Sequence, residues 1–95
     1  MEFEVNIQGN LVAVFRRIGY KYIGTDTNRG DFSFVRPIDP FGYPRFHIYY
    51  DPQKGIASIH IDQKRPVYDN QKAHDADYSG PVIEAEVSRI KSLLE

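Results

Sequence analysis

Three histidines are the residues of this 95-residue chain best suited to chemistry, because imidazole titrates near neutrality and binds transition metals. His47 lies in the segment Arg45 to Tyr50 and His60 in the segment Ile56 to Asp62, and both segments alternate apolar and polar residues. Such alternation predicts strands with one buried face. Each histidine falls on the polar face of its strand, and His74 follows in a polar stretch.

The turn between these two strands decides whether His47 and His60 meet. Residues directly opposite in an antiparallel pair point to the same face, so the register must place apolar residues opposite apolar residues. Pro52 suits a type I turn, and Gly55 suits the left-handed residue that closes a four-residue loop. This loop predicts His47 directly opposite His60. The alternative register, shifted by two residues, pairs His47 with Ser58 instead.

The favoured register also places Arg45 opposite Asp62 on the histidine-bearing face. Opposed side chains have Cβ atoms roughly 4.5–5.5 Å apart, and two imidazoles at that spacing can share a metal ion at about 2.0–2.1 Å. One hypothesis is therefore a divalent metal site with His47, His60, His74 and Asp62 as ligands. The alternative is a cross-strand ion pair beside two ordinary surface histidines, with no shared chemistry.

Helices are predicted at both ends of this strand region. Apolar residues at helical spacing predict a first helix over about 6–18, with Asn6 or Asn10 as its N-cap. The same spacing predicts a final helix over 81–94. Its acidic residues near the N-terminal end, Glu86 among them, suit the helix dipole.

The predicted fold class is α+β, with a four-stranded antiparallel sheet and two helices on one face, in the order α-β-β-β-β-α. Residues 1–95 are expected to form a single domain. The expected strands cover residues 20–25, 31–36, 45–50 and 56–62. Residues 63–80 are predicted to form a long irregular loop of undefined path.

Composition narrows the function classes. The chain has no cysteine, which excludes disulfides and thiol chemistry and suits a cytoplasmic location. Its apolar runs are shorter than the roughly 20 residues of a membrane span, so no membrane partner is expected. The net charge of −1 and pI of about 6.3 give no gross basic signature for nucleic acid.

The run Phe46-His47-Ile48-Tyr49, then Pro52 and Gly55, then Ser58-Ile59-His60-Ile61, resembles the HicA family of small toxin ribonucleases. The segments 16–20 and 80–94 are also similar to that family. The resemblance implies a fold like that of a double-stranded-RNA-binding domain. It also implies that His47 handles protons during RNA cleavage, with no cofactor.

An RNA ligand would need cations for its phosphates and aromatic rings for its bases. Arg45, Lys64 and Arg65 are the expected phosphate contacts, and Tyr49 is the expected stacking ring. The alternative is a scatter of solvated charges. The sequence leaves three functions open: an RNA-binding or RNA-cleaving module centred on His47, a metal-binding protein or metal-dependent hydrolase, and a non-catalytic module that binds a protein on its exposed sheet face.

Overall fold

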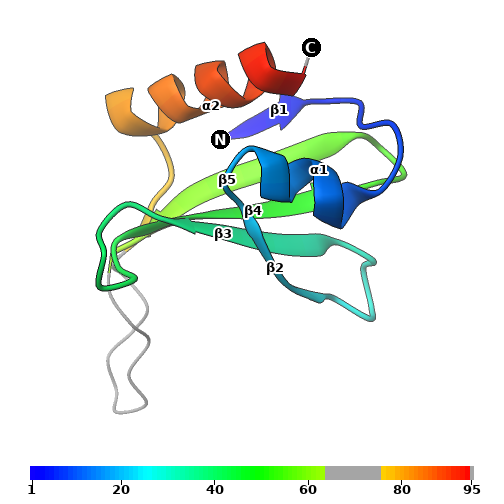
Figure 1. The fold of residues 1–95 in the computed structure, drawn as a ribbon, viewed down its shortest axis with the longest axis horizontal. Helices are drawn as coiled ribbons and strands as arrows, with labels where there is room; N and C mark the ends of the chain where they lie inside the picture. Colours follow the sequence, from blue (N-terminus) through cyan, green and yellow to red (C-terminus); the bar gives the residue numbers. More distant parts are fainter. Residues whose placement is uncertain (64–75, 95) are drawn as a thin grey trace.

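The computed structural model describes residues 1–63 and 76–94 and shows an antiparallel sheet with both helices packed against one face (Figure 1). The predicted α+β class is confirmed. The elements are β1 (Glu2–Glu4), α1 (Leu11–Arg17), β2 (Lys21–Thr25), β3 (Phe32–Pro37), β4 (Arg45–Asp51), β5 (Ile56–Asp62), β6 (Ala76–Asp77) and α2 (Pro81–Leu94). The strand order is β1-β5-β4-β3-β2, and β6 pairs with the end of β5.

The predicted count of four strands and the order α-β-β-β-β-α are wrong in detail. The strand β1 lies along β5, where Phe3 pairs with Ala57 and the Met1 carbonyl accepts a hydrogen bond of 2.9 Å from the Ile59 backbone. The short strand β6 occupies part of the predicted 63–80 loop and pairs with β5. Within that loop, residues 64–75 lie outside the described residues.

Helix α1 is shorter than the predicted span of 6–18. It begins at Leu11, and the Asn10 side chain caps it by accepting a 3.0 Å hydrogen bond from the Ala13 backbone. Gly9 has a φ of 93°, which a right-handed helix does not contain, so the helix cannot extend back to Asn6. Of the two predicted caps, Asn10 is therefore the correct one.

The predicted hairpin register is confirmed along the whole of β4 and β5. His47 lies opposite His60, and Arg45 lies opposite Asp62. The Asp51 carboxylate accepts hydrogen bonds from the backbone of the next turn, and the backbone nitrogen of Gly55 closes the turn on the Asp51 carbonyl at 2.8 Å. The inward residues of the hairpin are all buried, as predicted: Phe46, Ile48, Ile59 and Ile61.

A buried carboxylate fixes α2 to the sheet. Glu86 is 5% exposed, although the sequence indicated only that its charge suits the helix dipole. Its carboxylate accepts hydrogen bonds from the Tyr20 hydroxyl at 2.7 Å and from Arg89 at 2.7 and 2.8 Å, and Arg36 lies 3.4 Å away. Arg89 also donates to the Ile18 carbonyl at 2.9 Å. This network joins α2 to β3, to the end of α1 and to the start of β2.

We expect Glu86 to make the stability of the fold acid-dependent. Burial raises the Glu86 pKa, but hydrogen bonds from Arg89 and Tyr20 and the charge of Arg36 lower it further, so the net pKa lies below the ordinary 4.5. The stabilisation is complete above about pH 4.5 and is lost as the pH falls through the folded-state pKa. Glu86→Gln should lower the free energy of unfolding at neutral pH by about 1.5–3 kcal/mol.

Urea unfolding from pH 7 to pH 3 measures this effect. Glu86→Gln should flatten the acid limb of the stability curve, since glutamine does not titrate. Glu84→Gln is the matched control, because Glu84 is exposed on the same helix. An acid limb as steep in Glu86→Gln as in the wild type would contradict the assignment.

Candidate functional site

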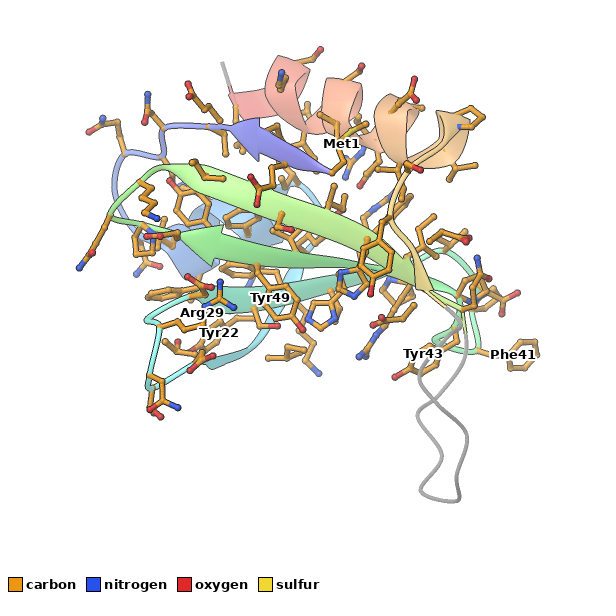
Figure 2. All side chains as sticks on the ribbon, turned by 180° about the vertical axis from the view of Figure 1, so that it is seen from behind. Met1, Tyr22, Arg29, Phe41, Tyr43 and Tyr49 are labelled. Atoms are coloured by element: carbon orange, nitrogen blue, oxygen red, sulfur yellow. The ribbon has the colours of Figure 1, made fainter. Side chains whose placement is uncertain are left out.

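The sheet face turned away from the helices, called the open face below, carries the candidate site. Figure 2 looks onto this face and shows Tyr49 on it. Its side chains come from three neighbouring strands, since β3 pairs with β4 and β4 with β5. They are Ser33, Val35, Arg45, His47, Tyr49, Ser58, His60 and Asp62.

Asp62 is the hub of the site. One carboxylate oxygen lies 3.0 Å from His47 Nδ1 and 3.2 Å from Arg45 Nε, and the other lies 2.9 Å from His60 Nε2. Burial raises the Asp62 pKa, but the hydrogen bonds and charges of His47 and His60 lower it further, to well below its usual range. Asp62 is therefore ionised at neutral pH and acts purely as an acceptor.

The ionised Asp62 carboxylate determines the histidine tautomers. Because it can only accept hydrogen bonds, both imidazoles must donate to it. His47 then carries its proton on Nδ1, and His60 carries its proton on Nε2. When His47 is neutral, Nε2 holds a lone pair, and the Ser33 hydroxyl lies 2.6 Å from it. Ser33 therefore donates to His47, which donates to Asp62, in one continuous chain of hydrogen bonds.

Aromatic rings enclose the two histidines. The rings of His47 and His60 are 4.9 Å apart, with Tyr49 4.5 Å from His47 and Tyr78 5.4 Å from His60. His47 is only 8% exposed as a result. Burial, followed by the charges of Asp62 and Tyr78, raises the Tyr49 pKa, so its hydroxyl stays protonated and remains a donor at neutral pH.

Of the three predicted phosphate contacts, the structure describes only Arg45. Arg45 is on the open face as predicted, but it pairs with Asp62 and its guanidinium lies 4.6 Å from the centre of the Tyr43 ring. Its positive charge is therefore largely neutralised within the protein by Asp62. Lys64, Arg65 and His74 lie outside the described residues, so their predicted roles as RNA contacts and as a third histidine ligand stay predictions.

Ser33 and Tyr78 are site residues that the sequence did not reveal. Alternation in β3 did place Ser33 opposite to Phe32 and Phe34, and therefore on the polar side. What the sequence lacked was the β3–β4 register, which pairs Ser33 with Tyr49 and Val35 with His47. The proline-containing loop that joins these strands contains a β-turn at Asp39–Gly42, but the loop is too long for its sequence to predict that register.

A groove continues from the histidine cluster along the open face. It has a volume of about 500 Å³, and Tyr49 and Ser58 line its end nearest the histidines. Charged side chains of both signs line the rest, including Arg29 and Lys54. This volume lies within the usual range of small-molecule sites.

Comparisons with protein-family models, with curated proteins and with solved structures found no match to this chain. Among the described residues, no helix has both the length and the apolar character needed to cross a membrane. Functional inference therefore rests on the geometry of the open face.

We expect Asp62→Asn to break the hub. An asparagine offers one weaker acceptor oxygen and presents N–H donors to a histidine that also donates, so the free energy of unfolding should fall by about 1.5–3 kcal/mol. Asp51→Asn is the matched control, because the amide oxygen can still accept from the turn backbone.

Nitrogen-15 NMR of the imidazole rings tests the tautomers directly. In the wild type, with both rings neutral, His47 should be protonated on Nδ1 and His60 on Nε2. In Asp62→Asn at least one ring should lose this fixed tautomer. Identical ring spectra in the two proteins would rule out Asp62 as the hub.

Proposed function

We propose that the open face is a hydrolytic site in which Ser33 is the nucleophile, His47 the general base and Asp62 the residue that orients His47. The observation that carries the proposal is the pair of hydrogen bonds on the His47 ring, to Ser33 at Nε2 and to Asp62 at Nδ1. The same connectivity activates serine in unrelated hydrolases, where it is recognised by geometry rather than by fold.

The reaction that fits this geometry is the hydrolysis of a carboxylic ester. Ser33 Oγ bonds to the carbonyl carbon while its proton passes to His47 Nε2. The bond to the alcohol oxygen then breaks, and His47 returns the proton to that oxygen. Water attacks the resulting acyl-serine by the same route, with His47 again as base and then acid. Asp62 holds the ring and stabilises the imidazolium.

The developing oxyanion needs a donor from a side chain. Ser33 pairs with Gly24 on one side and with Tyr49 on the other, so its backbone N–H belongs to the sheet ladder. Tyr49 is the best-placed donor, because it lies directly opposite Ser33 and its raised pKa keeps the hydroxyl protonated. The groove beside Tyr49, with its mixed charges, favours a small polar ester over a long acyl chain.

A serine-directed fluorophosphonate tests the nucleophile without knowledge of the natural substrate. The wild type should gain one covalent adduct on Ser33, mapped by peptide mass spectrometry, and should hydrolyse a small activated ester. Ser33→Ala and His47→Ala should each lower that esterase rate at least about 10³-fold. Ser88→Ala, an exposed serine on α2, should leave it unchanged.

The proposal fails if the wild type takes up no label, or if Ser33→Ala is labelled as well as the wild type. Circular dichroism of each variant separates loss of chemistry from loss of fold. Asp62→Asn should lower the rate less than His47→Ala does, because the base is still present but no longer held in one tautomer.

RNA cleavage of the HicA-like kind is the second candidate, and the observation that favours it is the second imidazole. His47 and His60 lie side by side on the same carboxylate, which suits one base and one acid. The base would take the 2′-hydroxyl proton as that oxygen bonds to phosphorus. The acid would protonate the departing 5′-oxygen. Tyr49 and Tyr78 offer rings for the bases.

The same variants distinguish the two candidates. RNA cleavage by paired imidazoles should fall about 10²–10⁴-fold in His47→Ala and in His60→Ala, and should survive in Ser33→Ala. Serine chemistry requires Ser33 instead. Measurement of 2′,3′-cyclic phosphate ends on a single-stranded RNA detects the reaction, and their absence after incubation with the wild type would remove this candidate.

A further inference from the structure

We propose that His47, His60 and Asp62 form a binding site for one divalent transition metal of the zinc class. The ligand atoms converge from β4 and β5, and one ring nitrogen of each histidine and one Asp62 carboxylate oxygen all lie within 4.8 Å of one another. The proposal does not depend on hydrolysis by Ser33. Metal binding is measured by itself, so the two can fail separately.

The ligand atoms lie close enough to bind one metal ion after the two rings turn. Bonds of about 2.0–2.1 Å to nitrogen and 2.0–2.2 Å to oxygen place two ligands of a tetrahedral ion about 3.3–3.4 Å apart. The His47–Asp62 and His60–Asp62 contacts of 3.0 and 2.9 Å are shorter by a few tenths of an ångström. The ring centres are 4.9 Å apart, so binding one ion requires the two rings to turn toward each other.

Proton positions change without any net loss of protons. The metal takes the lone pair of His47 Nδ1, and the ring proton moves to Nε2, where it is donated to Ser33 Oγ. The His60 proton likewise moves from Nε2 to Nδ1. An outer hydrogen bond of this kind orients most metal-binding histidines, and Ser33 already lies 2.6 Å from Nε2.

The donor set selects the class of ion. Two imidazoles and one carboxylate suit zinc and its neighbours, whereas magnesium and calcium prefer oxygen ligands alone. The ligands lie on paired strands, so little ordering is needed on binding. These three residues leave one position of a tetrahedral ion for water.

The positive charge of Arg45 should weaken metal binding, so removing this charge is the sharpest test of the site. Its Nε lies 3.2 Å from the Asp62 oxygen that His47 also contacts, so a cation at the hub meets a guanidinium. Arg45→Gln removes that charge and should tighten zinc binding several-fold. A misfolded variant, or binding elsewhere on the surface, would not produce a gain in affinity.

Isothermal titration calorimetry of metal-free protein with zinc, and the visible spectrum of the cobalt complex, measure the site. The wild type should bind one equivalent, and the cobalt spectrum should be that of a four-coordinate ion with nitrogen and oxygen ligands. His60→Ala and Asp62→Asn should weaken zinc binding by at least about ten-fold, the scale known for loss of even an outer partner. Asp51→Asn should bind as the wild type does.

Two results would overturn the metal site. One is the absence of saturable binding at one equivalent in the wild type. The other is an affinity that stays the same in His60→Ala and in Arg45→Gln, which would place the ion elsewhere. Esterase activity with no metal binding would remove this inference and keep the proposed function. Metal binding, together with no esterase activity in the metal-free protein, would keep this inference and remove the proposed function.

Discussion

The register of the β4–β5 hairpin is the constraint on which the core and the site both depend. A slip of one residue would turn His47 toward the helices and Ile48 toward the open face, exposing the core. A slip of two residues would keep the faces but would separate His47 from His60 and Arg45 from Asp62. The turn that ends at Gly55 therefore fixes a site about 13 Å away, at the usual rise per residue of a strand.

Gly55 allows the turn to fix this register. Its φ is 67°, and a Cβ atom there would lie 2.8 Å from the Asn6 side-chain oxygen. Both conditions exclude most other residues. The hairpin is local in sequence, so its geometry follows from the turn residues and from the alternation of apolar and polar residues. The sequence therefore predicts that His47 lies opposite His60.

Features that depend on distant parts of the chain were not predictable in this way. Ser33 reaches His47 through the β3–β4 register, and a loop of seven residues, 38–44, separates these strands. Strand β1 has three residues, too few for alternation to stand out, although Phe3 between Glu2 and Glu4 shows it. The burial of Glu86 was not predicted either, because one of the arginines that neutralise it comes from β3. Local pattern carries no information on such partners.

Two carboxylates, one on each side of the sheet, differ in whether the side chains that bind them can exchange protons. Glu86 is held by Arg36, Arg89 and Tyr20, and none of these exchanges a proton at neutral pH. Asp62 is held mainly by His47 and His60, whose ring protons can change position or give way to a metal. At neutral pH the network around Glu86 therefore keeps one arrangement, whereas the one around Asp62 can change its proton positions.

The proposed serine chemistry and the proposed metal binding both depend on the His47 ring. His47 Nδ1 either carries the proton that binds Asp62 or offers its lone pair to a metal, and it cannot do both. In the first state Ser33 donates to Nε2 and its oxygen can become a nucleophile. In the second state Nε2 donates to Ser33, so no lone pair remains to accept the serine proton. Metal binding and serine activation therefore exclude each other at this site, because both use the two nitrogens of His47 in opposite senses.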